Sequence, residues 1–252
     1  MKVALVGGGQ PRFTKEFSVL MKQLSGFDKA DFYFNFWTSS WVKDELEARQ
    51  RIESVLEPKY SLAEIRIIDQ PSYELPPHQK HHEPEAYPNT HWAYKRRLGM
   101  WLSVRLAFQL INEDYDVVLK IRPDGMLTNE VNLSKLDLVN NDLIFPNFPR
   151  NGYTGKEICD QFVIGTQSGI DFYSSLADMF GQYVPEVYPQ WEDNIHYWAS
   201  EHLLAHHLDK HSRQQIVGDY GVILAGQARS VTQGRSQFTD NHFHHPVVEG
   251  LI

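Results

Sequence analysis

The sequence predicts an α/β fold, in which a mostly parallel central sheet is flanked by helices. Short apolar runs alternate with amphipathic segments through the first half, as expected for strand–helix–strand units. The second half contains further strands and helices in a less regular order. The 252 residues show no internal repeat and no linker-like stretch, so we expect one domain with a sizeable core.

The expected strands are compact apolar runs, and the expected helices carry apolar side chains at a spacing of three and four residues. In the first half we expect strands at residues 2–7, 31–38 and 63–69. We expect helices at 12–24, after a cap at Ser39 or Ser40, and from about 94 to 111. The segment 70–93, rich in proline and histidine, reads as a long loop.

The second half opens with the stretch DYDVVLKIRPDGMLT at 114–128, whose apolar run is a buried strand that stops at a proline and a glycine. Further strands are expected at 142–147 and 159–166, with a last strand pair within 213–225. Helices are expected at about 167–180 and 194–208.

The charge and composition limit the classes of function. The formal net charge is −8, which disfavours a general nucleic-acid binder, because such proteins usually carry a basic face. No apolar stretch approaches the ~20 residues of a membrane span, so we expect none. The lone Cys159 rules out an internal disulfide and fits a reducing compartment, so we predict a cytoplasmic protein.

The end of the strand within 114–128 carries the most specific signal. Lys120 and Arg122 are two residues apart and point to the same side, where they can neutralise the oxygens of a diphosphate. Asp124 lies at the carboxyl end of the strand, where ligands gather in open α/β sheets, and is a suitable ligand for Mg²⁺ or Mn²⁺. The alternative is that the two cations form a structural ion pair with Asp116 or another carboxylate.

A glycine-rich segment, GGGQPRF, joins the first strand to the first helix. It matches neither the dinucleotide fingerprint nor the Walker loop. Its backbone amides and a cation can still face a nucleotide, which makes Gly8, Gly9, Gln10 and Arg12 candidate nucleotide-binding residues. A plain tight turn is the alternative.

In their order along the chain, GGGQPRF, the aromatic strand FYFNFW, a long helix, YDVVLKIRPDG and CDQFVIG resemble small bacterial and viral glycosyltransferases of the GT-A fold. The resemblance spans most of residues 1–225. It implies a GT-A-like, Rossmann-like sandwich in which about 1–125 bind the nucleotide and about 126–252 form the acceptor and catalytic half. The substrates it implies are a nucleotide-diphosphate sugar, most simply a UDP-sugar, and a glycan or other hydroxyl acceptor.

The resemblance also implies a metal. In the GT-A fold an Asp-x-Asp motif binds the ion that grips the diphosphate, whereas here Arg122 replaces the first aspartate and leaves Asp124. A second ligand often comes from near the C-terminus, where His242, His244 and the adjacent His245 are available in NHFHHP. We therefore expect Mn²⁺ or Mg²⁺, although the missing aspartate leaves open whether the metal is strictly required. The alternative for the histidines is a solvated tail.

Two carboxylates are candidates for the catalytic group that orients or deprotonates the acceptor hydroxyl. The resemblance points to Asp160, at the start of DQFVIG. Glu201 is the second, because helical spacing places it on an otherwise apolar stripe with Tyr197, Leu204 and Leu208. The alternative for Glu201 is a structural pair with an arginine. The rival functions are a nucleotidyltransferase and a non-catalytic nucleotide- or carbohydrate-binding module.

Overall fold

The structure of the chain is a computed structural model. The structure describes residues 1–13, 15–39, 42, 44–73, 88–139, 142–146, 158–187, 200–213, 216–218 and 222–224. None of the helices formed by these residues combines the length and the apolar character needed to cross a bilayer.

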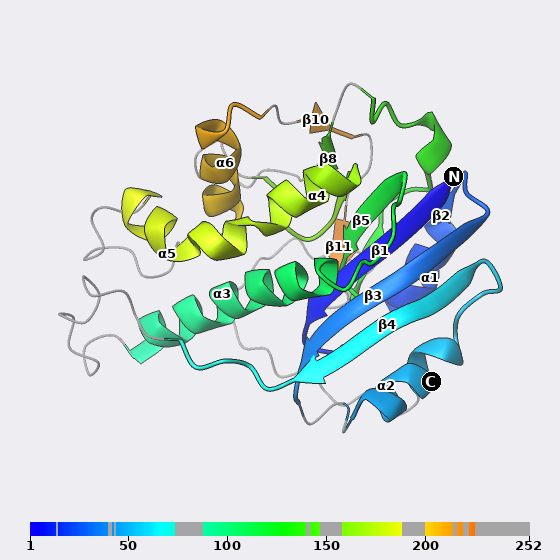
Figure 1. The fold of residues 1–252 in the computed structure, drawn as a ribbon, viewed down its shortest axis with the longest axis horizontal. Helices are drawn as coiled ribbons and strands as arrows, with labels where there is room; N and C mark the ends of the chain where they lie inside the picture. The colour runs from blue at the N-terminus through cyan, green and yellow to red at the C-terminus, as the bar shows by residue number, and fades with distance from the viewer. Residues whose placement is uncertain are drawn as a thin grey trace, which may run out of the picture.

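The main sheet has seven strands within the described residues (Figure 1). In chain order they are β1 (Lys2–Gly9), β3 (Lys29–Trp37), β4 (Tyr60–Ile68), β5 (Val117–Ile121), β8 (Leu143–Phe145), β9 (Val163–Gly165) and β10 (Ile216–Val217). Across the sheet they follow the order β10-β8-β9-β5-β1-β3-β4. Neighbours are parallel, except that β9 is antiparallel to both β5 and β8. The predicted mostly parallel α/β sheet is confirmed.

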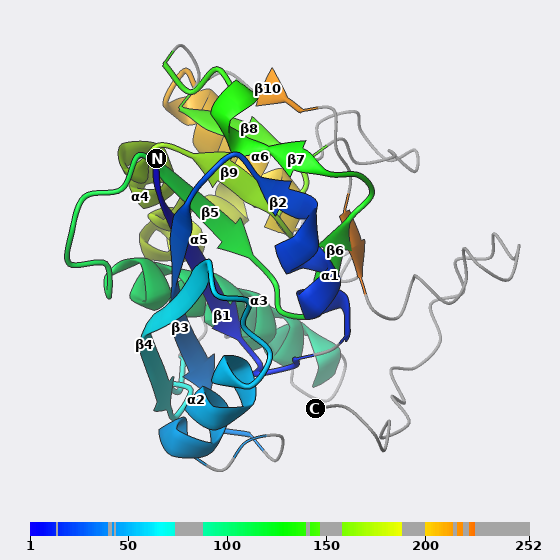
Figure 2. The same cartoon turned by 90° about the vertical axis from the view of Figure 1, so that its right-hand side faces the viewer.

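The strand order has a reversal next to β1. The chain moves outward from β1 through β3 to β4, and then returns along α3 (Pro88–Phe108) to place β5 on the opposite side of β1. The segment β4-β3-β1-β5 thus has the 3-2-1-4 order of doubly wound folds, whose ligands bind beyond the carboxyl ends of the strands where the order reverses. In Figure 2 the arrowheads of β1, β3 and β4 point to one edge of the sheet.

Helices cover both faces of the sheet (Figures 1 and 2). On one face lie α1 (Lys15–Gln23) and α2 (Glu45–Glu53), and on the other lie α3, α4 (Gln167–Ser174), α5 (Leu176–Val187) and α6 (Ser200–Lys210). This division follows from the connections, because α1 and α2 link β1, β3 and β4 in succession, whereas α3 makes the return crossing.

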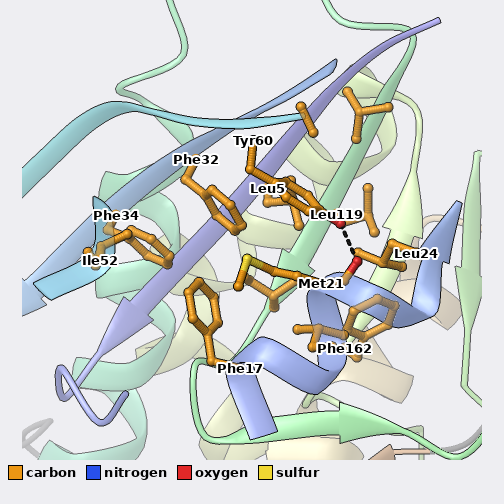
Figure 3. Packing of buried hydrophobic residues seen from close by; sticks show 14 of the residues in the cluster. Leu5, Phe17, Met21, Leu24, Phe32, Phe34, Ile52, Tyr60, Leu119 and Phe162 are labelled. Carbon is orange, nitrogen blue, oxygen red and sulfur yellow. Dashed lines mark hydrogen bonds between the residues drawn. The ribbon is translucent and has the colours of Figure 1, made fainter. Parts of the chain in front are cut away.

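The face under α1 is built on aromatic rings (Figure 3). Strand alternation places Phe32 and Phe34 of β3 on this face, where their rings stack with centroids 5.5 Å apart. Phe17 and Met21 of α1 pack into the same cluster, and the Tyr60 hydroxyl donates to the Met21 carbonyl at 2.5 Å. This packing fixes α1, and with it the loop that leaves the end of β1.

On the opposite face, α3 packs tightly against the end of β1. Gly8 is the point of closest approach, because a Cβ built on it would lie 2.6 Å from the Ser103 carbonyl carbon. Trp37, the last residue of β3, donates from Nε1 to the Gly99 carbonyl at 3.1 Å. Trp101 is fully buried beside Tyr173 of α4. These contacts hold the middle of α3 at the carboxyl edge of the sheet.

Two small sheets extend this frame. β2 (Leu24–Ser25) pairs in parallel with β7 (Val131–Asn132), which leads into the 3₁₀ helix η2 (Leu133–Lys135). β6 (Gly125–Leu127) pairs antiparallel with β11 (Val222–Leu224). The predicted strand pair within 213–225 is therefore wrong as a pair, because β10 joins β8 and β11 joins β6.

Two helix predictions also need correction. Helix α2 begins later than a cap at Ser39 or Ser40 implies, because Ser39 forms an isolated β-bridge with Val42. Its cap is Asp44, whose side chain accepts from the Glu47 amide at 2.9 Å. The helix expected at 167–180 is two helices, α4 and α5, which meet at Ser175.

Candidate functional site

The candidate site lies where the ends of β1 and β5 meet. Gly7 and Ile121 are register partners, so the segments that follow, 9–12 and 122–125, leave the sheet side by side. The middle of α3 crosses beside them, held by the contacts at Gly8 and Gly99. Three segments far apart in sequence therefore converge at the reversal of strand order, which is the usual ligand position in this architecture.

A tight turn ends β5 and pairs two of the predicted site residues. The Gly125 amide donates to the Arg122 carbonyl at 3.1 Å, with Pro123 in the second position of the turn, where its fixed φ is favourable. The turn brings the side chains of Arg122 and Asp124 together, and Arg122 donates from Nε and Nη2 to the two carboxylate oxygens at 2.8 and 2.7 Å. Arg122 therefore forms an ion pair with a carboxylate, which was the alternative expectation for the two cations of this strand.

The electrostatics of this pair follow from its partial burial. Burial alone would raise the pKa of Asp124, but the hydrogen bonds and charge of Arg122, together with the charge of Arg12, lower it overall. Burial would lower the pKa of Arg122, but the hydrogen bonds and charge of Asp124 raise it overall. Both groups are therefore ionised at neutral pH.

Three further guanidinium groups lie near this pair and, together with Arg122, are here named the arginine cluster: Arg12, Arg96, Arg97 and Arg122. Partial desolvation lowers the pKa of Arg96, and the charges of Arg12, Arg122 and Arg97 lower it further. Arg12 follows β1, Arg96 and Arg97 lie in α3, and Arg122 follows β5. Two carboxylates act on Arg122, namely Asp124 and Asp160, and Arg12 also acts on Asp124. The cluster therefore gathers four cations at one edge of the sheet in an otherwise acidic protein.

Lys120 lies behind the cluster and has a different environment from the one expected. It is 2% exposed, and its ammonium donates to the backbone carbonyl of Asp160, which also accepts from the Tyr173 hydroxyl at 3.0 Å. Burial lowers the pKa of Lys120 to about 8, an effect that the charge of Asp160 partly offsets. Lys120 thus contacts the protein backbone and is not open to solvent.

Gln161 links the arginine cluster to Asp160. Its side-chain oxygen accepts from Arg122 Nη1 at 2.6 Å, and its amide nitrogen donates to the buried Asp160 carboxylate. A continuous polar chain therefore runs from Asp124 through Arg122 and Gln161 to Asp160. Burial raises the pKa of the neighbouring Cys159 thiol to about 12, which leaves it unreactive.

Glu201 reaches the same region from α6. It lies in the first turn of that helix and is partly exposed, while Leu204 and Leu208 of the predicted apolar stripe are fully buried. Burial raises the pKa of Tyr173, and the charges of Asp160 and Glu201 raise it further. The two candidate catalytic carboxylates therefore lie around the same tyrosine, although 41 residues separate them in sequence.

The glycine-rich segment has a structural explanation. β1 extends to Gly9, so Gly8 is a strand residue that allows α3 to approach, and Gly9 turns the chain with a φ of +99°. Both glycines place Gln10 and Arg12 at the edge of the sheet. The Nε atom of Arg12 is buried, and the part of the chain that the structure describes offers it no hydrogen-bond partner.

The residues described here do not fit the implied metal in this arrangement. Of the expected ligands, His242 and His244 lie outside the described residues, and Asp124 has both oxygens engaged by Arg122. The described part of the chain has no group of three histidine, cysteine, aspartate or glutamate side chains placed to bind a metal. A metal ion stays a prediction.

Sequence reasoning missed three residues of the site, namely Arg96, Arg97 and Gln161. The signal for the first two was the run KRR near the start of the expected helix 94–111. Gln161 directly follows the predicted Asp160, but nothing in its local pattern indicates a contact with Arg122.

No protein family description matches the chain, and no curated protein matches it.

Proposed function

We propose that the protein is a glycosyltransferase that takes a nucleotide-diphosphate sugar, most simply a UDP-sugar, and transfers the sugar to a hydroxyl of a glycan or related acceptor. The observation that carries the proposal is the arginine cluster at the reversal of strand order in a mostly parallel sheet. A doubly wound sheet binds its ligand there, and four guanidinium groups suit a multiply charged anion such as a diphosphate. This arrangement is compatible with a GT-A-like fold.

The polar chain between the cluster and Asp160 supports a division of roles. Arginines at the donor end stabilise the negative charge that develops on the leaving diphosphate. Asp160 or Glu201, around Tyr173, orients or deprotonates the acceptor hydroxyl. Lys120 holds the Asp160 backbone, so it acts as a positioning residue. A cytoplasmic location belongs to the same proposal, which we base on the lone cysteine.

The test is product analysis with a panel of nucleotide sugars and hydroxyl acceptors, with and without Mn²⁺. Release of a free nucleoside diphosphate indicates glycosyl transfer. Release of pyrophosphate would instead indicate a nucleotidyltransferase, and binding without turnover would indicate a non-catalytic module.

Asp124→Ala should abolish transfer, because Arg122 loses the partner that fixes its orientation. The variant should keep the circular dichroism spectrum and cooperative melting of the wild type. Full activity in a folded Asp124→Ala protein would refute the role of this residue.

A further inference from the structure

The arginine cluster has a further consequence that rests on the proposed function. We infer that its guanidinium groups bind the donor diphosphate directly, without a divalent metal between them, and that Asp124 serves to orient Arg122. The ligand class assigned to the cluster is therefore a free diphosphate, as inorganic pyrophosphate or as part of a nucleotide.

The first argument concerns Asp124. A metal-binding carboxylate must direct an oxygen lone pair to the ion, and the bidentate Arg122 guanidinium already occupies one lone pair on each oxygen of Asp124 at 2.8 and 2.7 Å. The side chain of Asp124 is 13% exposed and that of Arg122 is 27% exposed, so the pair is partly shielded from water. Breaking the pair to bind a metal would leave a partly buried guanidinium without its counter-charge.

The second argument concerns the surrounding charge. A divalent cation beside Asp124 would lie in the field of Arg12 and Arg122, since both guanidinium groups already act on that carboxyl. Arg96 lies in the same positive field, because the charges of the other members of the cluster contribute to the lowering of its pKa. Like charges repel one another more strongly when they are partly shielded from water. A diphosphate reverses the sign of this interaction and relieves the repulsion.

The third argument concerns geometry. The cluster is assembled from three segments: the end of β1, the first half of α3, and the turn after β5. The segments converge at one edge, so their guanidinium groups can approach a phosphate chain from different sides, and each planar fork can bind two phosphate oxygens. The Nε of Arg12 is buried and has no hydrogen-bond partner among the described residues, so this donor is left unsatisfied beside the cluster.

The experiment is isothermal titration of the intact protein with inorganic pyrophosphate and with UDP, first in EDTA and then in Mn²⁺. Binding of both in EDTA, with little gain from Mn²⁺, is the expected result. Arg12→Gln and Arg96→Gln should each weaken binding by about ten- to a hundred-fold, as for the loss of a charge-assisted hydrogen bond. Arg96→Lys should recover part of the loss.

Arg51→Gln is the matched control, since Arg51 is exposed on α2 and pairs with Glu47. It removes the same charge and should bind pyrophosphate as the wild type does. Melting curves identify any variant that fails to fold. If one of the other variants does not fold, the test is the difference in pyrophosphate affinity between Arg96→Lys and Arg96→Gln.

The outcomes separate the inference from the proposed function. Binding that requires Mn²⁺, or equal binding by Arg96→Gln and the wild type, would overturn the inference and leave glycosyl transfer intact. Pyrophosphate binding in EDTA without turnover of any nucleotide sugar would support the anion site and count against the proposed function. Absence of binding under every condition would overturn both.

Discussion

Lys120 allows a quantitative test of how the site is built. Its pKa is lowered from 10.5 to about 8 because the ammonium is buried in contact with a carbonyl, and the charge of Asp160 only partly offsets this. In the unfolded chain the amine is hydrated and keeps its ordinary pKa. Between about pH 8 and pH 10.5 the unfolded state therefore binds a proton at this amine more readily than the folded state does. The free energy of unfolding therefore rises with pH across this window, and the destabilisation is fully present below about pH 8.

The magnitude follows from the two pKa values. Each pKa unit corresponds to about 1.4 kcal/mol, so the buried charge destabilises the folded state by about 3 kcal/mol below pH 8. Lys120→Met removes the titrating group and keeps the length of the side chain. The free energy of unfolding is measured in urea for both proteins. The wild-type value minus the Lys120→Met value should rise by about 2 to 3 kcal/mol between pH 7 and pH 10.

Taking the difference between two proteins cancels the other groups that titrate over this range. Lys22→Met is the control, because it makes the same substitution at an exposed position on α1. If the difference in free energy of unfolding between the wild type and Lys120→Met stays constant from pH 7 to pH 10, the reasoning is refuted. Lys120 would then keep its ordinary proton affinity in the folded protein.

Two further predictions concern the packing of α3 and α6. Gly8→Ala should lower the free energy of unfolding in urea by about 1 to 3 kcal/mol, because the new methyl group would lie 2.6 Å from the Ser103 backbone; an unchanged midpoint would contradict the close packing of α3. Burial lowers the pKa of His207 to about 4, while a hydrogen bond to the Phe172 carbonyl partly offsets this. The unfolded chain therefore binds a proton first as the pH falls, so the wild type should lose up to about 3 kcal/mol relative to His207→Gln between pH 6.5 and pH 4. Parallel acid transitions of the two proteins would contradict this assignment.

Much of the fold could be predicted from local pattern. The alternation of strands and helices predicts the parallel half of the sheet, because each element there is a continuous apolar run or a periodic segment. The boundaries were less accurate where a local interaction competes. The bridge between Ser39 and Val42 delays α2, and the short break at Ser175 divides a helical pattern that looks continuous.

The site was only partly predictable, for a reason that concerns topology. Arg122 and Asp124 stand next to the end of a predicted strand, so their position at the sheet edge follows from the sequence. Arg96 and Arg97 look like a solvated helix face until α3 is known to cross that edge. Gln161 meets Arg122 only because β9 runs antiparallel, and no local pattern reports the direction of a three-residue strand.

The direction of β9 has a consequence for how the two halves of the chain cooperate. A parallel strand delivers its last residue to the carboxyl edge, whereas an antiparallel strand delivers its first. Residues 159–161 can therefore enter the shared rim from the opposite direction to residues 122–125, with no intervening helix to keep them apart. In the proposed function, the hydrogen bond from Arg122 to Gln161 links the donor end of the site to the acceptor end. Slipping β9 by a single residue would turn its side chains to the opposite face of the sheet and break this link.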